Sequence, residues 1–350
     1  MRAVDIARAL HLSKATVSLA LNDKPGVSKE TREKILAYKE SVENGRIAPG
    51  QPLIQTVDVR AEGRTIIALM ISAGMKNIKN NELDLWMDVR EVFERNFRAS
   101  GYSFGLIYAD LDNDEEIERA IQDCNAPGIA GVILYATELQ DHDLQRFIKI
   151  CKPMVVYDYI GTTENVPFIS INNRQGVRLA VQELISKGNR DIIYFGMPMP
   201  MYNYLSRQRG FIDSMLDYGF SYDEAKSRII TTADTIAGCK KFCTAYLNHH
   251  SLPEAFLCES YHISIGLLSA LREMHFKIPE SVSVIGIDQL PDYLTGGINL
   301  TCVRVPHTER AYWTTKALLK EIKSPAREKA LIYVNCRLIP GDTVKDRTVS

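Results

Sequence analysis

The chain has 350 residues, of which 45% are hydrophobic, and its formal net charge is −1. A chain of this length and apolar content can bury more than one core, so we expect two or three domains. No apolar run reaches the roughly 18 residues that a membrane span requires, and the first residues form an amphipathic segment rather than a signal peptide. We therefore expect no membrane contact and a cytoplasmic location.

The charge is unevenly distributed along the chain. Residues 1–46 hold nine Lys and Arg against six Asp and Glu, a net charge of +3 that favours nucleic-acid contact at this end of the chain.

The seven cysteines are scattered. Cys239 and Cys243 lie four residues apart, but no second Cys or His pair at zinc-site spacing accompanies them. We expect reduced, buried thiols and neither a metal nor another cofactor.

The first forty residues predict three short helices. Apolar positions recur with helical spacing in residues 4–10 and again in residues 14–21, and only three residues separate the two segments. A third segment follows a Pro-Gly turn and begins at Ser28, a residue suited to an N-cap. This spacing predicts a helix-turn-helix with a supporting third helix.

The second predicted helix has two different faces, because each residue turns the helix by about 100°. The apolar face holds Val17, Ala20 and Leu21, with Thr16 at its edge. The opposite face is short enough to enter a DNA groove and consists of Lys14, Ala15, Ser18, Leu19 and Asn22. Ser13 stands where an N-cap belongs, and the backbone N–H groups of the first turn can bind a phosphate. We therefore expect this to be the recognition helix.

The run DIARALHLSKATVSLALNDKPGVSKETREKIL resembles the LacI/GalR family of bacterial repressors, and the resemblance continues over nearly all of the remaining chain. The resemblance implies base reading by Lys14, Ala15 and Leu19. It also implies phosphate contacts from Ser13, Thr16, Ser18 and Asn22. Many family members read a base with Arg where Leu19 stands, whereas an apolar Leu19 can contact a thymine methyl group but cannot pair with guanine.

Residues 47–64 are predicted to be a linker, since Gly and Pro interrupt the helical pattern there. In the family, the corresponding segment often forms a hinge helix that inserts a Leu into the minor groove. Leu53 and Val57, with Ile54 between them, are the candidates for such a wedge in this chain. A plain flexible tether is the alternative.

From residue 65 onward, strand-like and helix-like segments alternate. The strand-like runs are unbroken apolar stretches at residues 65–72, 102–108, 129–135, 153–158, 168–171, 191–196, 254–258 and 282–287. Strands that are covered on both faces have this composition, so the runs predict parallel sheets flanked by helices. Eight such units are too many for one doubly wound sheet of usual size, and we expect two lobes with a ligand at the carboxyl ends of the strands.

The fold class that follows is an all-α helix-turn-helix head joined to an α/β body of two doubly wound parallel-sheet lobes. The resemblance implies a body like that of a periplasmic sugar-binding protein, with three crossovers between the lobes. The expected boundaries are residues 1–46 for the head and 65–340 for the effector-binding and dimerisation domain. Within that domain we expect a first lobe at about 65–170 and 306–334, and a second lobe at about 171–305 and 335–345.

The motifs of common enzymes are absent or out of context. Residues 101–105 spell G-x-S-x-G, but a nucleophile elbow needs a strand before the Ser and a helix after it, and here the predicted order is reversed. No P-loop, G-x-G-x-x-G or H-E-x-x-H motif occurs. We therefore expect no enzyme activity and no catalytic residue.

Three candidates for the sugar pocket match family motifs at strand ends. The segment 206–211 resembles the family's R-x-x-G-F segment, which implies that Arg207 clamps ligand hydroxyls with its rigid donor fork. The segment 286–288 resembles the one whose Asp accepts hydrogen bonds from sugar hydroxyls, which implies this role for Asp288. Asp158 follows another strand and would line the pocket from the first lobe. Each of the three could instead form a structural ion pair or a cap.

Three further pocket candidates depend on the resemblance. Trp86 stands where the family places an aromatic residue that stacks on the ligand, although core packing of an amphipathic helix is an equal alternative. Glu259 stands where many members have Asn. Asp84 lies in the run 81–86, which looks like the GalR-type repressors of Gram-positive bacteria and suggests galactose or a galactoside.

The function that we expect is sequence-specific regulation of transcription, with a sugar releasing a repressor from its operator. A homodimer would place two recognition helices about 34 Å apart on pseudo-palindromic double-stranded DNA. No heptad helix follows Asp346, which favours dimers over coiled-coil tetramers. A sugar-binding component of a transport system and an α/β enzyme are the alternatives.

Overall fold

The structure is a computed structural model. It describes residues 6–7, 10, 12–22, 24, 26–28, 31–32, 35–36, 38–39, 64–73, 85–162, 165–325 and 328–348, and for residues 85–88 it describes only the backbone. The chain divides into two units, a head within Met1–Ala61 and a body that holds both sheets. Each unit is described by itself.

The head contains helix α2 (Lys14–Leu21), which spans the predicted recognition helix residue for residue. Ser13 caps it, because its side chain accepts a hydrogen bond from Thr16 N at 3.0 Å. Ser28 accepts in the same way from Thr31 N at 3.2 Å, at the start of the third helical segment. The buried side chains of the head form one small core of Ile6, Ala7, Val17, Ala20, Ile35 and Tyr38.

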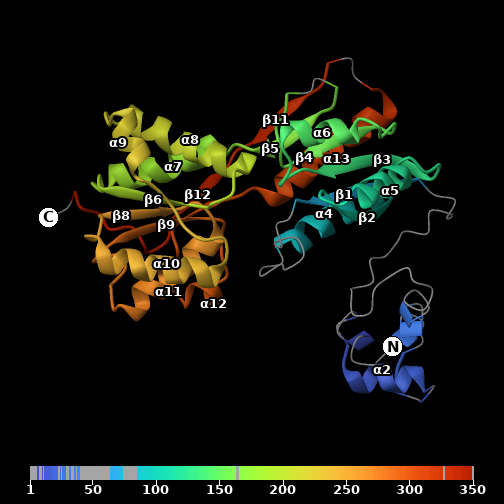
Figure 1. The fold of residues 1–350 in the computed structure, drawn as a ribbon, viewed down its shortest axis with the longest axis horizontal. Helices are drawn as coiled ribbons and strands as arrows, with labels where there is room; N and C mark the ends of the chain where they lie inside the picture. The colour runs from blue at the N-terminus through green and yellow to red at the C-terminus, as the bar shows by residue number, and fades with distance from the viewer. Residues whose placement is uncertain are drawn as a thin grey trace. The chain divides into compact units, whose positions relative to one another are not determined.

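The first lobe of the body is built on a six-stranded sheet with the order β11-β5-β4-β3-β1-β2 (Figure 1). Its strands are β1 (Thr65–Ser72), β2 (Ser103–Asp110), β3 (Ile129–Tyr135), β4 (Met154–Tyr157), β5 (Phe168–Ile171) and β11 (Leu331–Val334). Its helices are α4 (Leu85–Ala99), α5 (Asp114–Cys124), α6 (Asp141–Phe147) and α13 (His307–Lys323). The described backbone pairings between β1, β3, β4, β5 and β11 are parallel.

The second lobe is built on another six-stranded sheet, with the order β12-β10-β9-β8-β6-β7. Its strands are β6 (Ile192–Gly196), β7 (Ile229–Thr231), β8 (Ala255–Cys258), β9 (Ser283–Ile287), β10 (Cys302–Arg304) and β12 (Arg337–Ile339). Its helices are α7 (Asn173–Ser186), α8 (Tyr202–Asp217), α9 (Tyr222–Ser227), α10 (Ile236–His249), α11 (Tyr261–Glu273) and α12 (Asp292–Thr295). The described pairings are parallel except that of β10 with β12, which is antiparallel.

Helices cover both faces of the second sheet. Helices α7, α8 and α9 lie on one face and α10, α11 and α12 on the other (Figure 1). Two separate buried clusters correspond to these faces, one containing Val177 and Phe211 and the other containing Cys243 and Leu267. Strand β9 is buried along its whole length, as expected for a strand covered on both sides. The predicted fold class, an α/β body with two mostly parallel sheets, is confirmed.

The eight strands predicted from apolar runs are all present, each within two residues of the expected bounds. Strands β7, β10, β11 and β12 were missed. They have only three or four residues, and three of them lie at a sheet edge, where one side of the strand is exposed. A short edge strand carries no long apolar run, so hydropathy alone gives no signal for it.

The chain passes between the sheets three times: between β5 and α7, between β10 and α13, and between β11 and β12. Side chains tie two of these crossovers together. Asn172 Nδ2 donates to Asn335 Oδ1 at 2.8 Å, and Gln175 exchanges two hydrogen bonds with the backbone of Cys336. Among the described residues, no helix has the length and apolar character to cross a bilayer.

Candidate functional site

The face of α2 that was predicted to read DNA is largely exposed. Ser13, Lys14, Ala15, Ser18 and Asn22 are exposed, while Thr16 and Leu19 are half-buried. Some of these polar groups bind one another, since Asn22 Nδ2 donates to Ser18 O at 2.8 Å and the hydroxyls of Ser13 and Thr16 lie 2.8 Å apart. The wedge candidates Leu53 and Val57 lie outside the described residues.

Asp158 directly follows β4 and takes a left-handed backbone conformation, with a φ of 68°. Its carboxylate is buried, and both oxygens have partners: Thr137 Oγ1 donates to Oδ2 at 2.8 Å, and Arg310 forms an ion pair with Oδ1. The exposed fractions of the Asp158 and Arg310 side chains are 6% and 2%. These are the contacts of a structural ion pair in the first lobe.

Arg310 lies in the first turn of α13, and sequence reasoning missed it. Besides the ion pair, its guanidinium lies 4.8 Å from the centre of the Tyr157 ring, and Nη2 lies 3.0 Å from His307 Nδ1. Burial lowers the pKa of Arg310, but Asp158 and the neighbouring tyrosines together outweigh burial and raise the pKa above its ordinary value. The only available signal was a charged residue inside an amphipathic helix, which does not name its partner.

Arg207 lies in α8 and is 6% exposed. Nε donates to Asn173 Oδ1 at 2.9 Å and Nη1 donates to Glu259 O at 2.8 Å, so the second lobe holds the guanidinium in a fixed orientation. Among the residues that the structure describes, none accepts a hydrogen bond from Nη2. Burial lowers the pKa of Arg207, but Asp288, the neighbouring tyrosines and Glu259 together outweigh burial, and the pKa lies above its ordinary value.

Glu259 follows β8 and is fully buried, with an exposed fraction of 0%. Its carboxylate accepts hydrogen bonds from Met197 N at 2.6 Å, from Tyr194 OH at 2.8 Å and from Gln208 Nε2 at 3.2 Å. Burial raises the pKa of Glu259 to about 7, against the lowering effect of these donors. In this arrangement the Glu259 side chain is inaccessible to a ligand, and its backbone oxygen orients Arg207 instead.

Asp288 follows β9, again with a left-handed backbone, at a φ of 78°. Its side chain is 13% exposed, and Nε2 of His307 lies 3.9 Å from Oδ1. Burial raises the pKa of Asp288, but His307 and the charges of Arg207 and Arg310 outweigh burial, and the pKa lies below its ordinary value. Asp288 is therefore an ionised carboxylate with free hydrogen-bonding capacity next to a fixed guanidinium.

The two remaining sugar-pocket candidates, Trp86 and Asp84, cannot be placed by their side chains. The backbone of Trp86 belongs to α4, but its side chain, like the whole of Asp84, lies outside the described residues. The structure instead brings together three other aromatic residues that sequence reasoning missed. The ring centres of Tyr159 and Tyr202 are 5.2 Å apart, and Tyr202 OH lies 3.3 Å from Tyr333 OH. Tyrosines are common throughout this chain, so no pattern in the sequence distinguished these three.

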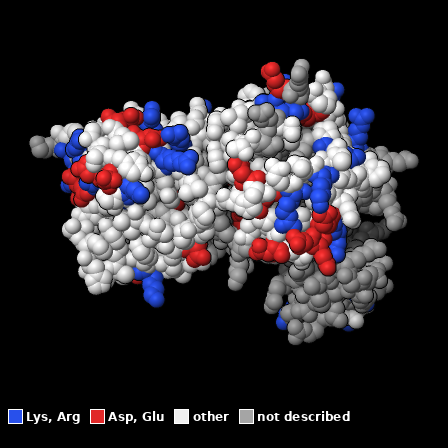
Figure 2. Space-filling model, turned by 45° about the horizontal axis from the view of Figure 1, so that its top comes forward, with Lys and Arg blue, Asp and Glu red and all other residues white. Residues whose placement is uncertain are grey.

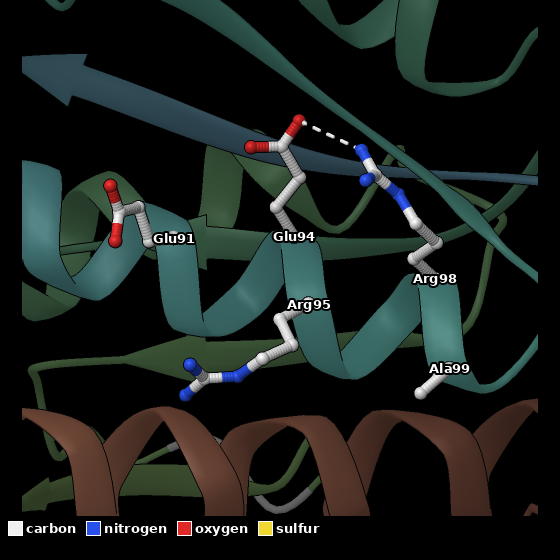
Figure 3. A pocket seen from close by; sticks show the side chains of 5 residues that line it. All are labelled: Glu91, Glu94, Arg95, Arg98 and Ala99. Atoms are coloured by element: carbon white, nitrogen blue, oxygen red, sulfur yellow. Dashed lines mark ion pairs between the residues drawn. The ribbon is translucent and has the colours of Figure 1, made fainter.

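A described hollow lies elsewhere in the first lobe. It has a volume of about 490 Å³ and is lined by Glu91, Glu94, Arg95, Arg98 and Ala99. Figure 3 shows that all five side chains come from α4 and that Glu94 and Arg98 form an ion pair, at 3.7 Å. The hollow includes none of the predicted sugar-pocket residues.

Among the described residues, no group of three or more His, Cys, Asp or Glu side chains is arranged to hold a metal ion.

Charges on the body are mixed in sign. On the face shown in Figure 2, basic and acidic side chains lie next to one another on both lobes. In the second lobe, two ion pairs join α7 to α8, between Arg174 and Asp213 and between Arg178 and Asp217. This face of the body therefore has no extended basic surface of the kind that attracts DNA phosphates.

Two sequence families match this chain. Residues 181–344 match the periplasmic binding protein-like domain, and residues 4–42 match the bacterial regulatory proteins of the lacI family. The head segment therefore matches a family of bacterial transcriptional regulators, and the chain is similar to such regulators over almost its full length. Members of this family are DNA-binding proteins, and the matched head segment contains the helix-turn-helix described above.

Individual relatives match the chain over almost its full length. It is 26% identical to the HTH-type transcriptional regulator MalR of Streptomyces coelicolor, over 98% of this chain and 96% of that protein. It is also 26% identical to the ribose operon repressor of Halalkalibacterium halodurans, over 97% and 96%. The solved complex of the transcriptional regulator CelR with cellobiose has the same fold, with a TM-score of 0.68 and 21% identity over 97% of this chain and 99% of that one.

Proposed function

We propose that this chain is a LacI-family repressor that a small sugar releases from its operator. The observation that carries the proposal is that Arg207, held in a fixed orientation on α8, and Asp288, at the end of β9, interact electrostatically in the second lobe of a chain whose head matches the lacI family of bacterial regulatory proteins. A fixed guanidinium donates to sugar hydroxyls, and an ionised carboxylate accepts from them. Since sugar and operator would favour different arrangements of the body, each would weaken the binding of the other.

For the effector site we propose a hierarchy among the six candidates. Arg207 and Asp288 contact the sugar directly, whereas the backbone oxygen of Glu259 orients Arg207 by accepting a hydrogen bond from Nη1. Asp158 acts through its ion pair with Arg310. Trp86 and Asp84 remain proposed ligand contacts at the start of α4, as the resemblance implies.

For the head we propose that Lys14, Ala15 and Leu19 contact base edges. The proposed phosphate contacts are Ser13, Thr16, Ser18 and Asn22, and the proposed minor-groove contacts are Leu53 and Val57. The exposure of Lys14 and Ala15 supports this assignment. Leu19 is half-buried and packs near Gly26, so only part of its side chain would reach a thymine methyl group. The head would be residues 1–46, the linker 47–64 and the effector domain 65–340.

The proposed active form is a homodimer, and the outer face of α4 supports it. Glu91 and Glu94 lie N-terminal to Arg95 and Arg98 on this helix, and most of these side chains are exposed (Figure 3). Two copies of such a helix that cross antiparallel about a twofold axis place the acidic half of one against the basic half of the other. Half-sites about 34 Å apart in a pseudo-palindromic operator would follow.

The effector class is proposed from the relatives. One relative is named a ribose operon repressor, and one neighbouring structure contains cellobiose. Galactose or a galactoside is the more specific proposal that the sequence suggested. A thermal-shift panel of galactose, lactose, cellobiose, maltose, ribose and glucose tests all of them, because a sugar at 100 times its dissociation constant adds about 2.7 kcal/mol of stability. Consumption of a panel sugar would instead indicate an enzyme, and the absence of any shift would contradict the effector site.

DNA binding is tested on a duplex selected from a random pool by the full-length protein. We expect Lys14→Ala to weaken binding to that duplex about tenfold. Lys24→Ala is the matched control, since Lys24 is an exposed lysine of the same head that lies beyond α2. Leu19→Arg should change the selected sequence. Equal binding by the two lysine variants would remove Lys14 from the proposed interface.

A further inference from the structure

We propose that Arg310 and His307 are positioning residues that connect the two strand-end aspartates and orient Asp288 for the effector. The proposal rests on the effector site proposed above and adds the means by which the first lobe acts on it. Asp158 follows β4 of the first sheet, and Asp288 follows β9 of the second. Between them stand Arg310 and His307, both in the first turn of α13.

The first link is the buried ion pair between Arg310 and Asp158. Asp158 fixes the guanidinium through Nη1, and the Tyr157 ring lies against the guanidinium at 4.8 Å. A guanidinium is planar, so fixing one edge also fixes the direction of the remaining N–H groups. Nη2 therefore has a defined direction, and it lies 3.0 Å from His307 Nδ1.

The second link fixes the tautomer of His307. A guanidinium has only donors, so Nδ1 must be the acceptor of the hydrogen bond from Arg310. When Nδ1 accepts, the ring proton lies on Nε2. Nε2 is the atom nearer Asp288, 3.9 Å from Oδ1. Arg310 thus turns an N–H group of His307 toward the carboxylate of the second lobe, without a direct hydrogen bond.

The third link lies at the point where the chain changes sheets. Asp288 N donates to Val303 O at 3.0 Å on β10, and His307 begins α13 directly after the crossover. Because 3.9 Å is longer than a hydrogen bond, Asp288 keeps its accepting capacity while His307 limits its orientation. Asp288 also faces the charge of Arg207 and the phenol of Tyr204, both from α8.

Histidine NMR tests the proposed connection from Asp158 through Arg310 and His307 to Asp288, and it needs no sugar. In the full chain with ¹⁵N-labelled histidine, we expect His307 to be the Nε2–H tautomer. Arg310→Lys keeps a charge for Asp158 but lacks the planar fork that places a second nitrogen next to Nδ1, so both tautomers should appear. Thr137→Val is the matched control, since it removes the other hydrogen bond to Asp158, at 2.8 Å, and should leave the tautomer unchanged.

A second variant covers the case in which Arg310→Lys fails to fold. His307→Asn changes a side chain that is 31% exposed, and it should raise the pKa of the Asp288 carboxyl, followed by ¹³C NMR, toward its ordinary value. It should also weaken binding of the sugar that the thermal-shift panel selects about tenfold. Two freely exchanging tautomers in the wild type, or an unchanged Asp288 pKa in His307→Asn, would overturn the positioning role of Arg310 and His307. A panel without any stabilising sugar, with the NMR results as expected, would overturn only the proposed effector.

Discussion

Asp158 and Asp288 occupy matching places in the two lobes and have different surroundings. Each directly follows a parallel strand, and each has a left-handed backbone, with φ values of 68° and 78°. The carboxylate of Asp158 is saturated by Thr137 and Arg310, whereas that of Asp288 accepts no hydrogen bond from the described residues and is 13% exposed. The same local structure therefore yields a structural ion pair in one lobe and a candidate ligand contact in the other.

Glu259 adds a third case to this comparison. It also follows a parallel strand, but it is buried without an ion-pair partner, and three neutral donors hold its carboxylate. Its pKa rises to about 7, whereas the pKa of Asp288 falls. Position at a strand end is thus a poor guide to chemistry unless the neighbours from other elements are known.

Breaking the ion pair should have the largest effect. Arg310→Met leaves the Asp158 carboxylate buried without its cation, and we expect a loss of about 3–5 kcal/mol in the free energy of unfolding. The double variant Asp158→Asn with Arg310→Met should recover most of that loss. Urea unfolding of the full chain measures both. If the single variant loses less than about 1 kcal/mol, the pair is not the structural contact described here.

The second prediction concerns the pH dependence of stability at Glu259. The folded pKa lies above the unfolded value of 4.5, so the folded state binds the proton more tightly. The resulting stability is fully present below pH 4.5 and is lost as the pH rises toward 7, at about 1.4 kcal/mol per pH unit. Relative to wild type, Glu259→Gln should therefore gain stability between pH 5 and pH 7. Parallel stability curves for the two proteins would show that Glu259 does not titrate in this range.

The third prediction tests the accessible carboxylate. Asp288→Asn removes an ionised acceptor and should weaken sugar binding at least tenfold, with a change in the free energy of unfolding below about 1 kcal/mol. Asp223→Asn, an exposed position on α9, is the matched control. Isothermal titration with the sugar selected by the panel measures both. Equal affinities would place Asp288 outside the effector site.

Thr137→Val should have the smallest effect on sugar binding. It removes one hydrogen bond to Asp158, at 2.8 Å, and leaves the ion pair with Arg310 in place. We expect a loss of about 1–3 kcal/mol in the free energy of unfolding and no change in sugar affinity. A change in sugar affinity comparable to that of Asp288→Asn would mean that the two strand ends are functionally equivalent.

The sequence predicted much of the fold because its signals are local. Apolar runs located eight strands, and the period of α2 separated buried Val17 and Ala20 from exposed Lys14 and Ser18. The edge strands were missed because so few of their residues are buried. The contacts of Arg310 and His307 with the two aspartates were also missed, since both residues stand about 150 residues after Asp158 in the chain.

By itself, the sequence determined the helix-turn-helix, the alternation of strands and helices, and the presence of acidic residues at strand ends. These features depend on periodicity and on residues that are neighbours in the chain. Only the tertiary structure decided that Asp158 forms an ion pair with Arg310, that Glu259 is buried and that Asp288 remains available to a ligand. The accessibility and charge of a carboxylate depend on burial and on groups from distant segments, which no local pattern contains.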